Sequence, residues 1–527
     1  MSTIKFTVVD DTALQYAVPN ELADVLLQYI EKCEILDRDD NNTTLLTYWG
    51  LKETTFLTQT IGIPNVPSPM LRDYNYPGLY KPFDHQRVTA EFLSTRQRAF
   101  CFNEAGTGKT SSVIWAADYL MNIGAIKRVL IVCPLSIMQS AWQQDLFKFA
   151  VHRTVDVAYG SADKRNKIAR SAAEFVVINY DGIPAIAATM IDKNMFDLVV
   201  IDEANAYKNV QTQRWKLMRK LVRDDSWLWL LTGTPAAQSP LDAYGLGKLC
   251  VPSRAPRFYG DYRESVMQQF GMYRWEPRPE AEKIVFEMLQ PAIRFTKAEC
   301  LDLPSVTHVT RMAPLSADQR KYYKELKDQL LLESNGEEVS AVNAAAKMSK
   351  LLQISGGAVY ADTGTVVHFD VSSRLKVVEE VIDEASHKVI VFVPFRHTIE
   401  MLHNHLTKAG ITNEVIHGDV SVRNRTEIFK KFQEQPNPRV LVVQPSAAAH
   451  GVTLTAANVI IWYSPVTSTE TYLQANARID RPGQRNPMTI VHIQGSPVEN
   501  RLYSMLQGNI NNHEKLIDLY KKELVET

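Results

Sequence analysis

The sequence predicts an α/β protein made of two doubly wound parallel-sheet lobes, with helical insertions and a small appended N-terminal domain. Short apolar runs, each long enough for one buried strand, alternate with segments of helical periodicity. In the first lobe such runs lie at 128–133, 175–178 and 198–201. Strands that alternate with helices pair in parallel, because each return to the same sheet edge needs a crossover segment. Similar runs in 372–500 predict the second sheet.

The chain divides into five predicted segments. Residues 1–75 form a small mixed α/β domain, with a strand-like stretch at 4–10 and helical spacing at 16–36. Its role stays open between a packing module and a substrate-specifying one. The remaining segments are a first lobe at 76–305 with a helical insertion at about 241–290, a helical linker or protrusion at 306–371, a second lobe at 372–500 and a C-terminal helix at 501–527.

Composition narrows the class of protein. The 527 residues suffice for about three domains, and 45% hydrophobic content can fill their cores. No apolar run approaches the ~20 residues that span a bilayer, and the first residues lack a signal-peptide layout. Five scattered cysteines without a C-x-x-C pair favour a reducing compartment and no structural metal: Cys33, Cys101, Cys133, Cys250 and Cys300. We therefore expect a cytosolic or nucleoplasmic protein without a membrane partner.

A glycine-rich loop carries the strongest chemical signal. It reads Asn103-Glu-Ala-Gly-Thr-Gly-Lys-Thr110, between a strand-like run and a helical pattern. Gly106 and Gly108 permit a turn whose N–H groups surround a phosphate at a helix N-terminus. Lys109 can then bridge the β- and γ-phosphates, and the Thr110 hydroxyl can bind Mg²⁺. Asn103 replaces the first glycine of this motif, and Asn tolerates a left-handed turn. A plain surface turn is the alternative, but the flanking pattern favours nucleotide binding.

Two carboxylates follow a later apolar run. Asp202 and Glu203 come directly after 198–201, so they reach the carboxyl edge of the predicted sheet, where such sheets bind ligands. We expect Asp202 to hold Mg²⁺ and Glu203 to orient and polarise the attacking water. Thr232 and Thr234, after another strand-like run, can sense a γ-phosphate, although an ordinary turn explains an isolated pair of this kind.

The order of these elements resembles the Snf2 branch of the superfamily 2 helicase-like ATPases. The resemblance runs from about residue 81 to about residue 494. The segments that carry it in the first lobe are 81–86, 103–110, 129–142, 202–205 and 231–238, and those in the second lobe are 389–395, 416–432, 444–458 and 474–484. The resemblance implies two RecA-like lobes that close on one ATP.

The resemblance also implies roles for individual residues. The implied nucleotide contacts are Gln86, as the reader of adenine, with Ala105, Gly106, Thr107, Gly108, Lys109, Thr110 and Gly451. The implied catalytic residues are Lys109, Asp202, Glu203, Arg478 and Arg481, with Arg481 as the arginine finger. Mg²⁺ would bind to Thr110 and Asp202. The chain departs from the family pattern at Asn103, Ala105, Asn205 and Ala477. None of these positions supplies the lysine, the carboxylates or the finger, so we expect an active ATPase.

DNA is the expected partner. The net charge of −1 does not indicate a strongly basic nucleic-acid binder, so contacts must come from local groups. Candidates are N–H and hydroxyl groups after Pro134, at Ser446 and at Thr453 to Thr455, which suit phosphates and carry no sequence preference. The resemblance implies translocation on duplex or branched DNA and remodelling of DNA or of a DNA-bound protein.

Two other functions stay open. A strand-separating DNA or RNA helicase would use the same motor. A nucleotide-gated binding or scaffold protein with weak turnover would fit the departures at Asn205 and Ala477. The compact form suits a monomer in the cytoplasm of a bacterial cell or a phage-infected host.

Overall fold

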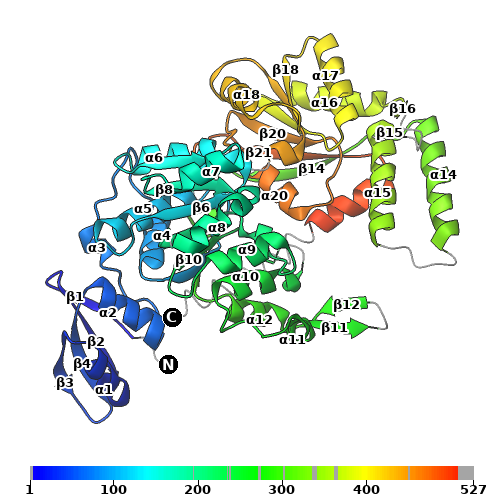
Figure 1. Ribbon diagram of the computed structural model, residues 1–527. Coiled ribbons are helices and arrows are strands. Elements are labelled where there is room, and N and C mark those ends of the chain that lie inside the picture. The colour runs from blue at the N-terminus through cyan, green and yellow to red at the C-terminus, as the bar shows by residue number, and fades with distance from the viewer. Residues whose placement is uncertain are drawn as a thin grey trace. The chain divides into compact units, whose positions relative to one another are not determined.

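The computed structural model describes residues 4–507 apart from 194, 234, 237–238, 271–273, 301–302, 335–340, 361–365 and 449–451. The described chain forms two compact units that meet in sequence at Cys300 and Leu301. Each unit contains a parallel sheet with helices on both faces (Figure 1). The predicted α/β class with two doubly wound lobes is therefore confirmed.

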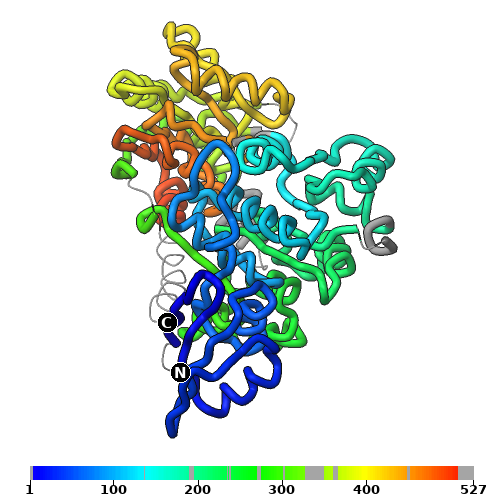
Figure 2. Tube along the Cα trace, turned by 90° about the vertical axis from the view of Figure 1, so that its left-hand side faces the viewer, coloured from blue at the N-terminus to red at the C-terminus, as the bar shows by residue number. Residues whose placement is uncertain are grey.

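The N-terminal segment is a four-stranded antiparallel sheet with one helix, in the darkest blue of Figure 2. Its strands, in the spatial order β1-β2-β4-β3, are β1 (Thr7–Val9), β2 (Ala13–Pro19), β4 (Asn42–Tyr48) and β3 (Cys33–Arg38), and its helix is α1 (Asn20–Tyr29). The helical spacing predicted at 16–36 was therefore wrong outside α1. Leu14, Tyr16 and Val18 alternate inward on β2, and the pairing of β2 with β4 decides the backbone there.

The first lobe is built on a seven-stranded sheet whose pairings are all parallel. In spatial order its strands are β13 (Ala292–Ile293), β5 (Arg98–Cys101), β10 (Trp227–Leu231), β9 (Leu198–Ile201), β6 (Val129–Cys133), β8 (Phe175–Asn179) and β7 (Val155–Ala158). The helices α4 (Asp84–Ser94), α5 (Lys109–Asn122), α6 (Gln144–Phe149), α7 (Ala162–Ala169), α8 (Ile183–Lys193) and α9 (Gln213–Leu221) cover it. Two separate apolar clusters, one per face, fill the layers between sheet and helices.

Short helices α2 (Leu51–Thr55) and α3 (Met70–Asp73) connect the N-terminal sheet to this lobe. The predicted helical insertion at 241–290 contains α10 (Ala243–Cys250), α11 (Tyr259–Val266) and α12 (Ala281–Met288). It also contains an antiparallel hairpin that was not predicted from sequence, formed by β11 (Met267–Phe270) and β12 (Arg274–Pro277). The Arg263 guanidinium lies 4.4 Å from the centre of the Trp275 ring, which ties the hairpin to α11.

The second lobe has a six-stranded sheet, again parallel in every pairing. In spatial order its strands are β14 (Val306–Met312), β21 (Met488–Gln494), β20 (Ala457–Trp462), β17 (Lys388–Phe392), β19 (Val440–Val443) and β18 (Asn413–Ile416). Its helices are α16 (Ser372–Glu384), α17 (Arg396–Lys408), α18 (Val422–Glu434), α19 (Pro445–Ala448) and α20 (Thr469–Asn476).

The segment predicted as a helical linker, 306–371, needs correction. It begins with β14, which pairs with β21 along its whole length and so belongs to the second sheet. Its β-branched residues suit an edge strand. The helices α13 (Lys297–Cys300), α14 (Ala317–Ser334) and α15 (Ala341–Gly356) and the hairpin of β15 (Ala358–Tyr360) with β16 (Val366–His368) complete the region. Residues 497–507 are helical, and the rest of the predicted C-terminal helix lies outside the described residues.

Candidate functional site

The glycine-rich loop joins β5 to the first residue of α5, at the carboxyl edge of the first sheet. Gly106 and Gly108 have φ angles of 92° and 85°, which side chains disfavour. A Cβ on Gly108 would lie 2.0 Å from Nε2 of Gln86. Lys109 donates from Nζ to the Asn103 carbonyl over 2.8 Å, so its side chain curls over the loop. The loop thus has the backbone turn and the cation that phosphate binding needs.

The start of α4 is tied to the same loop. Gln86 caps this helix by accepting from the Phe83 N–H at 3.1 Å, and its Nε2 donates to the Thr107 carbonyl at 3.1 Å. His85 Nε2 lies 2.7 Å from the same carbonyl. A carbonyl can only accept, so Nε2 of His85 carries the proton. Burial lowers the pKa of His85. The contact from His85 was not anticipated, although this residue stands next to Gln86 in the segment 81–86.

Asn103 has a different structural role from the one predicted from sequence. Its backbone is not in the left-handed region, so tolerance of that conformation does not explain why Asn fits here. Instead its side chain, 1% exposed, links two elements to the loop. Nδ2 donates to Oγ1 of Thr89 on α4, and Oδ1 accepts from the Phe295 N–H just after β13, both over 2.9 Å.

The neighbouring Glu104 is held from the same strand exit. Arg294, almost fully buried, lies 3.2 Å from Glu104 and also donates to the Phe102 carbonyl. The second oxygen of Glu104 accepts from the Lys297 N–H over 3.0 Å. Arg294 was not among the predicted residues, because 190 positions separate it from Glu104 and only the pairing of β13 with β5 brings the two together.

Asp202 and Glu203 follow β9 at the same sheet edge as the loop. Asp202 accepts from the Trp142 indole N–H and from the Glu203 N–H, both at 3.0 Å. Burial raises the pKa of the Asp202 carboxyl, while the nearby Lys109 charge and these two hydrogen bonds act in the opposite direction. Lys109 and Asp202 are therefore close enough to interact electrostatically.

Glu203 has φ of 48°, a left-handed conformation that costs a residue with a side chain about 1 kcal/mol or more. Tyr180 holds this turn, because its hydroxyl donates to the Asp202 carbonyl over 2.6 Å. Trp142 and Tyr180 were not predicted as site residues. Trp142 lies within the resembling segment 129–142, but its partner is not apparent from sequence. Thr232 is buried and donates its N–H to the Cys101 carbonyl, whereas Thr234 lies outside the described residues.

The two predicted arginines belong to the second unit, just after α20. Arg478 is 2% exposed and donates to the carbonyls of Gln474 at 2.7 Å and Val452 at 3.2 Å. Arg481 is half-buried, and it donates to the Ala477 carbonyl and to the Thr453 hydroxyl, both at 3.1 Å. Gly451 lies outside the described residues. The structure thus brings the first-lobe residues to one sheet edge and places the arginines on the other unit.

Comparisons with known proteins find matches in both lobes. The model of the SNF2-related domain matches residues 85–357, and that of the helicase conserved C-terminal domain matches residues 373–483. The chain is 27% identical over 431 residues to an uncharacterized ATP-dependent helicase of Mycoplasma genitalium, covering 80% of this chain and 40% of that protein. It is 24% identical over 440 residues to putative protein p41 of Acyrthosiphon pisum secondary endosymbiont phage 1, covering 79% of this chain and 93% of that protein.

Among solved structures, the SWI2/SNF2 ATPase core of Sulfolobus solfataricus in complex with dsDNA is 22% identical, with a TM-score of 0.39, covering 84% of this chain and 94% of that one. The chain spans about two-fifths of the Mycoplasma relative but nearly all of the phage protein. Among the residues that the structure describes, no helix is both long and apolar enough to cross a membrane. Because the SNF2-related model alone matches more than half of the sequence, this chain belongs to the SNF2-related family of helicase-like ATPases.

Proposed function

We propose that this protein hydrolyses ATP between its two lobes and uses the cycle to translocate along duplex or branched DNA. The observation that carries the proposal is the grouping of Lys109 with Asp202 and Glu203 at one edge of a parallel sheet. A lysine at the start of a helix, beside a glycine turn and two carboxylates, suits phosphoryl transfer to water. Membership of the SNF2-related family supports DNA as the track.

Each first-lobe residue has a role in this proposal. Gln86 reads the adenine ring, and the N–H groups from Ala105 to Thr110 surround the β-phosphate. Lys109 leaves the Asn103 carbonyl and neutralises charge on the β- and γ-phosphates. Glu203 orients the attacking water and accepts its proton.

Thr110 and Asp202 fit a magnesium ion, because a hydroxyl and a carboxylate are oxygen ligands that this ion prefers. Burial raises the pKa of Asp202, so a cation in front of this carboxyl would favour its ionised form. When bound, Mg²⁺ would supply positive charge for the transferred phosphoryl group.

The second lobe supplies the arginines. We assign the finger role to Arg481, whose guanidinium is held by one carbonyl and one hydroxyl at the lobe surface. Arg478 is buried and donates to two carbonyls of its own lobe, so it suits a structural role that holds the residues after α20 in place. Closure of the lobes on ATP and release after hydrolysis would then move DNA past the protein. If each lobe holds neighbouring phosphates of one strand, repeated cycles give stepping without sequence preference.

The relatives from a bacterium and a phage support a cytoplasmic setting in a bacterial cell or a phage-infected host, where a DNA-bound protein is a further candidate partner. We propose that the chain acts as a monomer.

The test is ATP hydrolysis without nucleic acid and with single-stranded DNA, blunt duplex DNA, branched DNA or RNA. Lys109→Ala and Arg481→Ala are the test variants. Lys127→Ala and Arg423→Ala are matched controls, since both side chains are exposed on the same two lobes. Stimulation by duplex or branched DNA, lost in the test variants and kept in the controls, is the expected result. Stimulation only by single strands or RNA would indicate a strand-separating helicase, and no turnover would indicate a nucleotide-gated binding protein.

A further inference from the structure

Two aromatic side chains reach the Asp202 and Glu203 turn from the strands that follow β9 in the first sheet. In spatial order β9 is followed by β6 and then by β8, whereas the glycine-rich loop leaves β5 on the other side of β9. Trp142 lies in the segment after β6, and Tyr180 is the first residue after β8. Because the carboxyl ends of parallel strands meet at one edge, both side chains come to the turn from the side away from the loop.

Trp142 acts on the side chain of Asp202. The indole N–H donates to Oδ2 of Asp202 over 3.0 Å, and Oδ1 accepts from the Glu203 N–H, also over 3.0 Å. Since separate donors hold the two oxygens, the carboxylate cannot rotate without breaking both bonds. Each oxygen keeps a lone pair for a further contact, so the orientation is fixed while the ability to bind a cation is kept.

The chain after β6 holds the Trp142 ring in place. It passes through a short 3₁₀ helix, Leu135–Ile137, and then a π-helical turn, Met138–Gln143. Such turns are rare and are frequent at functional sites. Trp142 is fully buried in the apolar cluster that covers one face of the sheet. Packing therefore fixes the ring, and with it the direction of the N–H group.

The chemical type of this donor suits a metal ligand. An indole N–H is neutral, so it orients the carboxylate without cancelling the negative charge that attracts a cation. A lysine or arginine in the same place would form an ion pair with the carboxylate and compete with the metal ion. Partners that orient a metal ligand in this way typically govern metal affinity.

Tyr180 acts on the backbone of the same turn. Its hydroxyl donates to the Asp202 carbonyl at 2.6 Å, and the Glu203 carbonyl oxygen lies 3.2 Å away. Glu203 has φ of 48°, so its side-chain direction depends on a strained backbone that needs support. The Tyr180 ring is itself held, with the Tyr207 ring at 5.8 Å and the Arg214 guanidinium at 5.1 Å.

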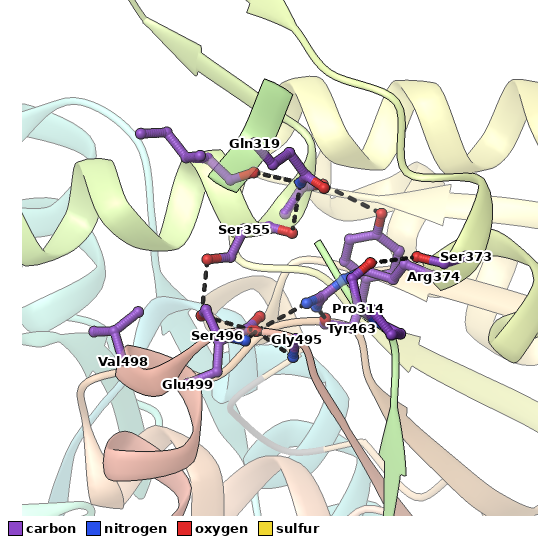
Figure 3. Close-up of polar contacts among 12 residues, drawn as sticks. Pro314, Gln319, Ser355, Ser373, Arg374, Tyr463, Gly495, Ser496, Val498 and Glu499 are labelled. Atoms are coloured by element: carbon purple, nitrogen blue, oxygen red, sulfur yellow. Dashed lines mark hydrogen bonds and ion pairs between the residues drawn. The ribbon is translucent and has the colours of Figure 1, made fainter. Parts of the chain in front are cut away.

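Hydrogen bonds to a buried carboxylate do not by themselves indicate a role in the reaction. In the second lobe Glu499 lies 2.8 Å from Arg374 and accepts from the Ser496 hydroxyl at 3.1 Å, as Figure 3 shows. Contacts of Ser355 and Tyr323 with the same turn fasten α14 and α15 to this lobe. No residue of that cluster is assigned to ATP chemistry, so its polar contacts serve the fold. The two donors after β6 and β8 differ, because they act directly on the proposed metal ligand and base.

We propose that Trp142 and Tyr180 are positioning residues with separate tasks. Trp142 fixes the Asp202 carboxylate for the metal ion, and Tyr180 fixes the backbone of Glu203 for the attacking water. This inference rests on the proposed function, in which Asp202 holds Mg²⁺ and Glu203 orients the water. Loss of the first donor should therefore weaken metal binding, and loss of the second should slow the reaction without weakening it.

The test variants are Trp142→Phe and Tyr180→Phe, which each remove one donor and keep an aromatic ring. The control for the first is Trp229→Phe, a fully buried tryptophan of β10 whose indole donates to a backbone carbonyl over 2.9 Å. The control for the second is Tyr244→Phe, 4% exposed on α10, whose hydroxyl lies 3.2 Å from two successive carbonyl oxygens. A role in stability alone predicts the same behaviour in each variant and its control.

The first measurement is Mn²⁺ binding, followed by electron paramagnetic resonance with a non-hydrolysable ATP analogue and without DNA. Mn²⁺ replaces Mg²⁺ here because it prefers the same oxygen ligands. The Kd for Mn²⁺ should rise by about 10- to 100-fold in Trp142→Phe and stay within about twofold in Tyr180→Phe and both controls. An unchanged Kd in Trp142→Phe, or an equal rise in Trp229→Phe, would overturn the role of Trp142.

The second measurement is ATP hydrolysis with saturating duplex DNA over a range of Mg²⁺ concentrations. Trp142→Phe should need more Mg²⁺ and should recover kcat to within about threefold of the parent at saturation. Tyr180→Phe should lose about 10- to 100-fold in kcat at every Mg²⁺ concentration, because a misplaced catalytic group is not restored by metal. An unchanged kcat in Tyr180→Phe would overturn its role, and the same pattern in both variants would overturn the separation of tasks.

Failure of the proposed function would be seen in other proteins of the same series. Asp202→Asn should weaken Mn²⁺ binding, and the parent should hydrolyse ATP faster with duplex DNA. Unchanged Mn²⁺ binding in Asp202→Asn, or no DNA-stimulated hydrolysis in the parent, would reject the proposed function. Neither result depends on Trp142→Phe or Tyr180→Phe, so the two failures are distinguishable.

Discussion

The substitution Asn103→Ala tests whether this side chain, rather than a left-handed backbone, is what the phosphate loop needs. It removes two hydrogen bonds of 2.9 Å, to Thr89 and from the Phe295 N–H. Thr89 keeps its bond to the His85 carbonyl, so its hydroxyl is not left without a partner. The Phe295 N–H loses the acceptor that Asn103 supplies. One lost hydrogen bond at about 1 kcal/mol and one unsatisfied N–H at ~1–2 kcal/mol predict a loss of ~2–3 kcal/mol in the unfolding free energy of the first lobe.

Thermal unfolding measures this loss. At about 2–4 °C per kcal/mol for a domain of this size, Tm should fall by about 4–12 °C. Amide exchange at Phe295, followed by mass spectrometry of peptides covering 290–297, should accelerate. KM for ATP should rise more than kcat falls, because the loop backbone that Asn103 anchors also accepts the hydrogen bond from Lys109.

Asn103→Asp is the matched control. It keeps an oxygen for the Phe295 N–H, and the Thr89 hydroxyl can rotate to donate to the second oxygen, so less than half of the loss is expected. A change in Tm below about 1 °C for Asn103→Ala, or an equal loss in both variants, would refute the reasoning.

Three further predictions concern other parts of the two lobes. Gly108→Ala should weaken binding of an ATP analogue by about tenfold or more, because it adds backbone strain at φ of 85° and a clash with Gln86. The control is Gly124→Ala, which has φ of 75° and open space around its Cβ, and it should leave binding unchanged in the same titration. Arg481→Lys should lower kcat by about 10³-fold with little change in Tm, whereas Arg478→Lys should lower the Tm of the second lobe. The opposite pattern would make Arg478 the arginine finger and Arg481 the structural residue. Burial lowers the pKa of His492 to about 4. The stability that the neutral ring contributes is therefore complete above its unfolded pKa of about 6.5, and up to ~3 kcal/mol is lost as the pH falls toward 4. Denaturant unfolding at several pH values should show this slope, and His492→Gln should flatten it.

Much of the fold could be predicted from sequence because buried parallel strands are encoded locally. The runs at 128–133, 175–178 and 198–201 became β6, β8 and β9, since a short apolar stretch between helical segments suits a strand that helices cover on both faces. Edge elements were harder to predict. The strand β14 is exposed along most of its length and gains its identity only from β21, 182 positions away in the chain. The hairpin of β11 and β12 likewise depends on packing against α11.

The site residues likewise divide into those that can be predicted from sequence and those that cannot. The glycine turn, Lys109, Asp202 and Glu203 are short motifs whose chemistry follows from residue type and spacing, so their assignment needed no structure, and their roles remain predictions for the assays above. His85, Trp142, Tyr180 and Arg294 are supports for these groups, and each acts on a partner that lies far along the chain or across the loop. Such partners are not apparent from sequence, because the type of a hydrogen-bonding side chain does not indicate which distant group it will contact in the fold.

The sequence by itself determined the α/β class, the membership of the SNF2-related family and the residues proposed for ATP chemistry, because these depend on local periodicity and on contiguous motifs. Only the tertiary structure decided what Asn103 does, where the second sheet begins and how α14 and α15 are fastened to it. Those features depend on pairs such as Asn103 with Phe295 and Arg374 with Glu499, which are 192 and 125 positions apart. Contacts of this range form only when the whole lobe has folded around them.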